Sequence, residues 1–195
     1  MSFIISDGTG TGKSAKVDEE NRLTCRVDSR SQIAFISQEK EQAYVISTGE
    51  LAVDTTGGQM LWMLNSSQTK HIHLSQIWVS WNGGNTTKNT IVRAALWGAT
   101  TAPTANNTAN PGSNLNTGSG NNADITAYSW NGVGSAMTGS TGGGAVGYAF
   151  CGNGVTNIQV NDSMIIQFND SIAFNLIGEE TGLASILASF YFVEG

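Results

Sequence analysis

Charged residues are scarce in this chain of 195 residues: they make up 12% of it, about half of the share of about 25% that is usual in globular proteins. The last basic residue is Arg93, so residues 94–195 contain no lysine or arginine. This part cannot neutralise phosphate groups, which argues against direct binding of nucleic acid. Five of the nine basic residues lie between Lys13 and Arg30. We therefore expect the N-terminal segment and the rest of the chain to face different surroundings.

Cysteines and long apolar runs are also rare. Cys25 and Cys151 are the two cysteines, and two distant cysteines do not make a disulfide framework, so we expect both to be free thiols. No apolar run reaches the length of about 18 residues that a membrane-spanning helix needs. The first residues, MSFIIS, lack the charged and apolar regions of a signal peptide. The sequence therefore predicts synthesis in a reducing cytoplasm and no association with a membrane.

Arrangements of catalytic residues are missing as well. The chain has two histidines and no G-x-S-x-G nucleophile motif. Asp162 and Asp170 would lie at the two ends of one expected strand, about 25 Å apart at about 3.3 Å per residue. A glycosidase needs its two carboxyl groups much closer together. We expect a protein that is not an enzyme and that needs no cofactor.

Short runs of alternating apolar residues are abundant from residue 44 onward. They are rich in Ile, Val, Phe, Trp and Tyr, and Gly, Asn and Thr separate them, which is typical of strands and turns. Because the second half shows no helical periodicity, the pattern predicts an all-β fold, a jelly-roll-like antiparallel β-sandwich. The expected strands are 44–47, 50–54, 60–65, 71–82, 89–97, 125–130, 145–150, 155–160, 163–168, 171–177 and 184–193.

Three of these strands carry finer predictions. The strand 184–193 is apolar on both faces, so it is either central in a sheet or in contact with another subunit. In the strand 71–82 the alternation changes phase near Ser75 and Gln76, which indicates a β-bulge. Asn169 and Asp170 separate two alternating runs and predict a hairpin turn.

The chain divides into a mixed-charge arm over residues 1–43 and a body over residues 44–195. Within the body, residues 98–124 and 131–144 are long and polar. Loops of this length are usually functional or mobile, although they can also be solvated connections without a role.

The stretch Asp7–Ser14, DGTGTGKS, is similar to the phosphate-binding P-loop G-x-x-x-x-G-K-[ST]. However, Asp7 occupies the position of the first required glycine, and a carboxylate there opposes an anionic phosphate. The following residues, AKVDEENRL, have no apolar stripe for a helix. We interpret the glycines as flexible turn residues in an arm that becomes ordered on a partner.

Two further patterns suggest binding. His71 and His73 would lie on one face of a strand; two imidazoles are too few for a closed metal site, but a trimer could supply six. The alternative is an ordinary solvated or subunit-facing surface. Trp81 and Trp130 each lie next to an Asn-Gly pair and are the candidates for stacking on a glycan, whereas Trp62, Trp78 and Trp97 fit a core.

The N-terminal residues also carry a family resemblance. Residues 6–23, SDGTGTGKSAKVDEENRL, are followed by AYVISTGELAV and MLWMLNSS. Together they resemble the start of head-decoration and head-fibre proteins of tailed bacteriophages, in which a DGTG-x-G-x-x-A-K-V arm leads to an A-Y-x-x-x-T-G strand. The glycine-rich MTGSTGGG and the final ASFYFVE are similar to the bodies of these proteins, more loosely. Residues 98–117 depart from the family, which often has more charge there.

The resemblance implies a virion structural protein on the outer capsid surface, assembled in the host cytoplasm, whose jelly-roll body often forms a trimer. The expected partners are the major capsid protein and further copies of the chain, and the expected role is to decorate and stabilise the head. The alternative is a receptor-binding or glycan-binding adhesin of a tail or fibre. The residues expected to dock the arm on the capsid are Asp7, Gly8, Lys13, Lys16, Arg22, Arg26 and Arg30.

Overall fold

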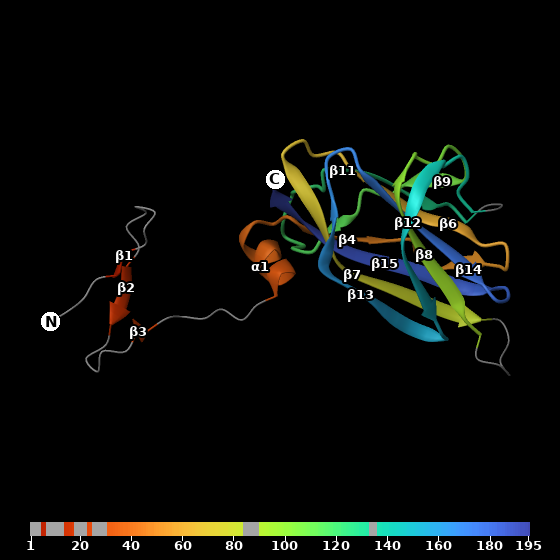
Figure 1. The fold of residues 1–195 in the computed structure, drawn as a ribbon, viewed down its shortest axis with the longest axis horizontal. Helices are drawn as coiled ribbons and strands as arrows, with labels where there is room; N and C mark the ends of the chain where they lie inside the picture. The colour runs from red at the N-terminus through yellow and green to blue at the C-terminus, as the bar shows by residue number, and fades with distance from the viewer. Residues whose placement is uncertain (1–4, 7–13, 18–22, 25–30, 84–89, 133–135) are drawn as a thin grey trace. The chain divides into compact units, whose positions relative to one another are not determined.

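Two antiparallel sheets pack face to face in the computed structural model, which describes residues 5–6, 14–17, 23–24, 31–83, 90–132 and 136–195 (Figure 1). The first, called the β15 sheet here, has the order β10-β4-β15-β7-β13, and β5 pairs with β15 as well. Its strands are β4 (Ala43–Ser47), β5 (Leu51–Val53), β7 (Lys70–Gly83), β10 (Ser113–Asn114), β13 (Gly154–Ile166) and β15 (Gly182–Glu194).

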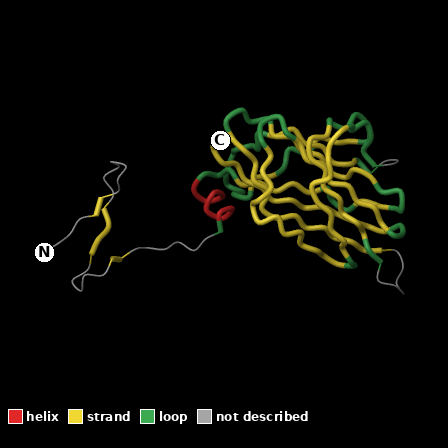
Figure 2. Tube along the Cα trace, in the orientation of Figure 1, coloured by secondary structure: helices red, strands yellow, loops and turns green. Residues whose placement is uncertain are grey.

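The second sheet, called the β14 sheet, has the order β12-β8-β14-β6-β11-β9. Its strands are β6 (Gly58–Asn65), β8 (Val92–Thr100), β9 (Asn107–Ala109), β11 (Ile125–Trp130), β12 (Gly142–Cys151) and β14 (Ser171–Gly178). In Figure 2 strands account for most of the body, and the short helix α1 (Gln32–Glu39) lies beside them.

The strand order is that of a jelly roll. The four strands β4-β15-β7-β13 of one sheet face β6-β14-β8-β12 of the other, and the successive strands β12, β13, β14 and β15 alternate between the two sheets. Alternation of this kind produces the interlocked Greek keys of the jelly roll. The prediction of an all-β, jelly-roll-like antiparallel sandwich is confirmed.

The core lies between the sheets and is built from alternate residues of each strand. On β14, Ile172, Phe174 and Leu176 are at most 2% exposed, and on β15, Ile186 and Phe190 are at most 1% exposed. Because consecutive strand residues point to opposite sides, the residues between them lie on the outer faces of the sandwich.

The predicted bulge in the strand 71–82 is confirmed. Ser189 of β15 lies opposite Gln76, and the next residue, Phe190, lies opposite Leu74, so Ser75 is the extra residue of β7. The strands predicted at 155–160 and 163–168 form a single strand, β13, whose register shifts between Gln159 and Met164.

The predicted hairpin at Asn169 and Asp170 is wrong. A turn is present, with Asn169 at a φ of 63° and the Asp170 amide donating to the carbonyl of Gln167 at 3.0 Å. However, β13 before it pairs with β7, and β14 after it pairs with β6 and β8. The turn therefore carries the chain from one sheet to the other instead of joining two paired neighbours.

Helix α1 covers part of the outer face of the β15 sheet. Its Ile36 forms a small apolar cluster with Ala43 and Tyr191, next to Ile33 and Val193. This explains why β15 is apolar on both faces: it is central, between β4 and β7, and its outer face is buried at one end by the helix.

The chain separates into two compact units, Met1–Ser31 and Gln32–Gly195. The expected arm over residues 1–43 therefore crosses the boundary, because α1 and the start of β4 belong to the second unit. In the first unit, β2 (Ser14–Val17) pairs antiparallel with both β1 (Ile5–Ser6) and β3 (Leu23–Thr24).

Candidate interaction surface

The two sheets end in short added strands on one side of the sandwich and in long edge strands on the other. On one side, the polar segment 98–124 supplies β10, which pairs with β4 at the end of the β15 sheet, and β9, which pairs with β11 at the end of the β14 sheet. On the other side, the edge strands are β12 and β13. Within the described residues, no further strand pairs with either of them. We call this side, formed by β12 and β13, the open edge.

Large apolar side chains are concentrated on the open edge. Strand β12 exposes Val146 (53%), Tyr148 (57%) and Phe150 (70%), and strand β13 exposes Val155 (72%) and Ile165 (50%). These five account for half of the ten large apolar side chains that are exposed in the described part of the chain. A concentration of this kind is typical of a surface that contacts another protein.

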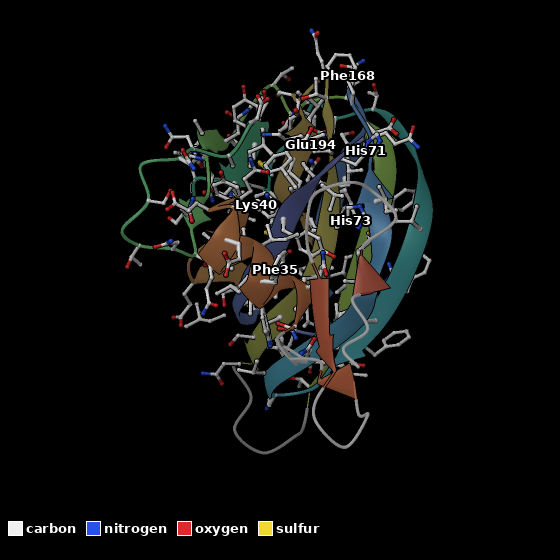
Figure 3. All side chains as sticks on the ribbon, turned by 90° about the vertical axis from the view of Figure 1, so that its left-hand side faces the viewer. Phe35, Lys40, His71, His73, Phe168 and Glu194 are labelled. Atoms are coloured by element: carbon white, nitrogen blue, oxygen red, sulfur yellow. The ribbon has the colours of Figure 1, made fainter. Side chains whose placement is uncertain are left out.

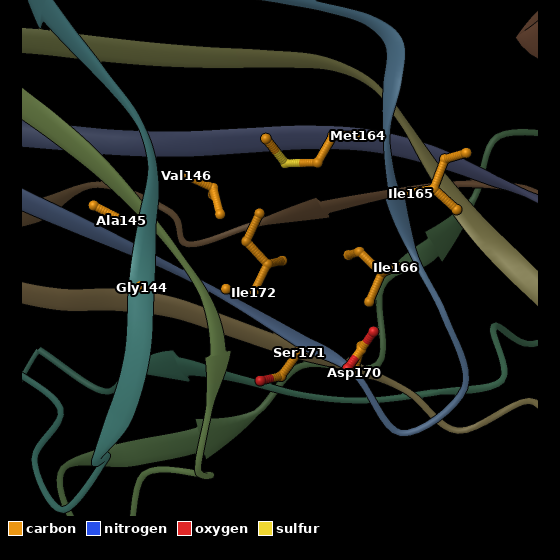
Figure 4. Close-up of a pocket in the computed structure, with 10 residues that line it drawn as sticks. Gly144, Ala145, Val146, Met164, Ile165, Ile166, Asp170, Ser171 and Ile172 are labelled. Atoms are coloured by element: carbon orange, nitrogen blue, oxygen red, sulfur yellow. The ribbon is translucent and has the colours of Figure 1, made fainter.

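A hollow of about 380 Å³ opens between the two sheets at this edge. Figure 4 shows Val146 of β12 on one side, Met164 and Ile166 of β13 on the other, and Ile172 of β14 between them. Most of the side chains that line it are apolar, with Asp170 and Ser171 at one end. The hollow gives an apolar group from a partner a place to insert.

The open edge also lacks the usual protection against pairing. Exposed edge strands of soluble proteins normally carry lysine, proline or inward-pointing charges, which prevent them from joining another sheet. Strand β12 contains no charged residue and no proline, and β13 contains only Asp162. Arg93 of the neighbouring strand β8 lies 6.0 Å from the ring centre of Tyr148, so its cation is directed over an aromatic ring.

The sequence predicts strands at 145–150 and 155–160, but its alternation does not show that they form an interaction surface. The signal was the absence of charge from residues 142–161. The lack of charge alone could not reveal an interaction surface, because only the strand order shows that both strands are edge strands on the same side of the sandwich.

The first unit contains the glycine-rich motif. Ser14, the last residue of the P-loop-like stretch, begins strand β2, which pairs antiparallel with β1. A phosphate-binding loop requires a helix at this point, so the structure agrees with the rejection of a nucleotide site. Of the expected docking residues, Lys16 lies in β2, whereas the following lie outside the described residues: Asp7, Gly8, Lys13, Arg22, Arg26 and Arg30.

His71 and His73 lie on the outer face of the β15 sheet, because Ile72 and Leu74 between and after them are fully buried (Figure 3). The ring of His73 stacks on Tyr191 at a centroid distance of 5.3 Å. The Nδ1 atom of His71 is buried without a hydrogen-bond partner among the described residues. The pair therefore shares a face, as expected, and a metal site shared between copies stays a prediction.

The two tryptophans expected to contact glycans are not on the surface. Trp81 is 1% exposed, and its indole Nε1 donates to the Thr90 hydroxyl at 3.2 Å, so its prediction as a glycan contact is wrong. Trp130 is 7% exposed and lines a cavity with Asp54 and Thr56. Only a small part of its ring is accessible, and its contact with a glycan stays a prediction.

The polar segment 98–124 is fixed to the body by its own hydrogen bonds. The Glu41 carboxylate accepts from the Ser119 hydroxyl at 2.7 Å and from the Asn121 amide at 3.4 Å. The Asn114 side chain donates to the Glu41 carbonyl at 2.8 Å. Amide and hydroxyl side chains thus replace salt bridges as the means of holding a long connection in place.

Two buried groups have perturbed acid–base behaviour. Burial raises the pKa of the Cys151 thiol, and a hydrogen bond with Thr156 opposes that shift. Burial also raises the pKa of the Tyr44 hydroxyl, and the nearby Asp124 carboxylate raises it further. Cys151 is a free thiol and is fully buried.

Within the described ranges, no three side chains of His, Cys, Asp or Glu come together as metal ligands. The one helix in the described part of the chain is too short to cross a membrane. Comparisons of the chain with protein-family models, with curated proteins and with solved structures gave no match.

Proposed function

We propose that the protein is a non-enzymatic structural component of a tailed-bacteriophage virion that decorates and stabilises the outer surface of the head. The similarity of residues 6–23 to the N-terminal arms of such proteins supports this role. The motif lies in a compact unit of its own, Met1–Ser31, separate from the jelly-roll body. In this proposal the first unit binds the major capsid protein and the body stands outside the shell.

The body forms a trimer through the open edge in this proposal. The observation that carries this step is the pair of long edge strands, β12 and β13, which are almost without charge and expose Phe150 and Val155. A trimer requires a heterologous contact, in which the open edge of one copy meets a different surface of the next copy, and such a contact would remove these side chains from water. Trimer formation also multiplies the weak contacts of each arm with the capsid, because three arms act together.

The basic residues of the first unit provide the charge contacts with the capsid. Five of the nine lysines and arginines lie before residue 31, together with five acids, so the contacts would be made by individual cations and not by a net positive charge. Dissolved ions screen the attraction between exposed charges, so salt would weaken the contacts between these cations and an acidic patch of the shell. We therefore expect attachment to depend on ionic strength.

Quantitative mass spectrometry of purified virions tests the location. A decoration protein is present in many copies, in a fixed ratio to the major capsid protein, and cryo-electron microscopy then shows its density over the head. A handful of copies confined to the tail contradicts the proposal and favours the adhesin.

A variant without Met1–Ser31 tests the attachment. We expect its body to remain folded, with an unchanged circular dichroism spectrum, and to be lost from capsids in a sedimentation assay that retains the full chain. A truncated protein that still sediments with capsids would show that the first unit is not the anchor.

A further inference from the structure

A polar cavity of about 210 Å³ lies on the outer face of the β14 sheet. Its floor comes from three neighbouring strands: Gln59 of β6, Ala173 and Asn175 of β14, and Trp97 of β8. Asn175 is directed away from the core because its neighbours in the strand, Phe174 and Leu176, face inward. The cavity shares none of its lining residues with the hollow at the open edge.

A strap formed by residues 137–142 supplies the wall of this cavity. At one end the Met137 amide donates to the Gln59 carbonyl at 3.1 Å. At the other end the Thr141 amide donates to the Thr101 hydroxyl at 2.7 Å, after which β12 begins. Because β14 lies between β6 and β8, the strap spans the width of β14, and Ser140 from it lines the cavity.

Three buried polar atoms at this cavity have no hydrogen-bond partner among the described residues. They are Nε2 of Gln59, Nε1 of Trp97 and Oδ1 of Asn175. Gln59 is 6% exposed, so its amide is well removed from bulk water. Four buried side-chain atoms lack a partner in the described part of the molecule, and three of the four belong to residues that line this one cavity.

Buried polar atoms without a hydrogen-bond partner destabilise the folded state. A buried donor or acceptor without a partner costs about 1–3 kcal/mol, and nearly all such groups in native proteins are satisfied by protein, water or ligand. A buried Trp N–H in particular usually finds an acceptor. Their convergence on one hollow indicates that a molecule from outside the chain completes the hydrogen bonds.

We propose that this cavity binds a single neutral sugar ring, either as a free saccharide or as the terminal unit of a glycan. The two unpaired donors and one acceptor match hydroxyl groups, each of which donates and accepts. The indole of Trp97 offers an apolar face for the C–H side of the ring, and hydroxyls of Thr100 and Ser140 add further partners. Among the described residues, none that lines the cavity is charged, which favours a neutral ligand over a uronic or sialic acid.

The volume of the cavity limits the bound ligand to a single sugar ring. Pockets for drug-sized ligands occupy about 300–1,000 Å³, and this one is smaller. A longer glycan would therefore place only its end in the cavity. The binding is separate from the attachment to capsids, so either can fail without affecting the other.

The test uses the full chain and the methyl glycosides of glucose, galactose and mannose. Saturation-transfer NMR and calorimetry should detect binding of at least one glycoside. Methyl glucuronide should bind more weakly than methyl glucoside. Glycans with the same sugar at the terminus, presented on an array, distinguish the two sources: binding only to the free glycoside assigns a saccharide, and binding to the array assigns a glycan end.

Two variants connect binding to the cavity. Trp97→Phe keeps an aromatic ring but removes the N–H, and we expect roughly tenfold weaker binding. Asn175→Leu removes the unpaired oxygen; binding should be lost while thermal stability is unchanged or higher, because a buried unpaired polar group has been removed. Trp78→Phe on the outer face of the β15 sheet is the matched control and should leave binding unchanged.

The proposal is overturned if none of the glycosides binds at saturating concentration. It is also overturned if Trp97→Phe and Asn175→Leu bind as the unaltered chain does, or if a crystal structure grown with the glycoside shows only ordered water in the cavity.

Discussion

Two glycines of the body, Gly178 and Gly182, lie close against the indole of Trp81. A Cβ atom added to Gly182 would lie 2.5 Å from Cη2 of this indole and 2.6 Å from the carbonyl oxygen of Asn82. The second neighbour is backbone within a paired strand, so it cannot move aside without disturbing the β7–β15 pairing. Glycine is required at this position by space, since its φ is not in the left-handed region.

We predict that Gly182→Ala lowers the free energy of unfolding by about 1–3 kcal/mol, the usual cost of overpacking a core. Gly120→Ala in the polar segment 98–124 is the control, because nothing lies within 4 Å of the added atom and its φ is ordinary. Urea denaturation measures both. Equal stability of the two variants would show that the β7–β15 pair can shift to make room.

The raised pKa values of Cys151 and Tyr44 predict a loss of stability in alkali. Each group keeps its proton in the folded state at a pH where the unfolded chain has already released it. Because the folded state then binds more protons, the free energy of unfolding falls as the pH rises. The decline should begin above the ordinary thiol pKa of about 8.5 and steepen above about 10.

Thermal unfolding between pH 7 and pH 11 measures this decline, and Cys151→Ala should reduce it in the lower part of that range. In a Cys25→Ser background, the remaining thiol should react with Ellman's reagent only after the protein is unfolded, since Cys151 is fully buried. Rapid reaction in native buffer would contradict the buried thiol.

Individual tryptophans show how far the sequence determines the surroundings of a side chain. Trp81 lies on the same face of β7 as Ile77 and Val79, and that face is the core. The neighbouring Asn82-Gly83 pair led to the prediction that Trp81 is exposed, and this prediction was wrong because Trp81 is buried. Two of the residues that enclose Trp81, Gly178 and Gly182, lie about 100 positions away in the sequence. No local pattern contains that information, and for the same reason Trp97 was assigned to the core rather than to a cavity.

The sequence predicts the positions of the strands better than it predicts which strands pair with each other. Every expected strand from 44–47 to 184–193 corresponds to a strand of the structure, and the bulge at Ser75 was visible as a change of phase. The partners were not visible: Asn169 and Asp170 were predicted to join paired strands, but their strands belong to opposite sheets. Alternation reports the faces of one strand, whereas pairing depends on the packing of the whole sandwich.

Helix α1 lies in the segment that the sequence assigned to the arm, and it determines where the body begins. Its Ile36 is 6% exposed and packs on Ala43 and Tyr191. We predict that residues 32–195 fold as stably as the full chain, whereas residues 44–195 lose at least about 2 kcal/mol of the free energy of unfolding, since burial of an isoleucine alone contributes about that much.

Denaturation of the two fragments by urea compares them directly, and the full chain serves as the reference. Equal stability of both fragments would mean that α1 only rests on the sheet. A loss of stability in both would mean that the first unit contributes to the folding of the body.

The molecule as a whole is asymmetric in how its sheet edges end. One side is closed by β9 and β10 from the polar insertion, and the other leaves β12 and β13 free to pair within the described residues. From its two apolar faces the sequence predicted that the strand 184–193 is either central or in contact with another subunit; β15 is central, and α1 covers part of its outer face. Half of the large apolar side chains that are exposed in the described residues lie on the open edge.

We predict that size-exclusion chromatography with light scattering gives three times the mass of one chain. Phe150→Lys and Val155→Lys should shift the protein toward a monomer in a concentration-dependent way, because each places a charge in every copy of the contact. Both positions are at least 70% exposed, so the monomer should keep its thermal stability. Leu115→Lys, at a 40% exposed residue of the polar insertion, is the control and should leave the mass unchanged. A monomer at every concentration, or lysine variants with the mass of the unaltered chain, would contradict a trimer formed through the open edge.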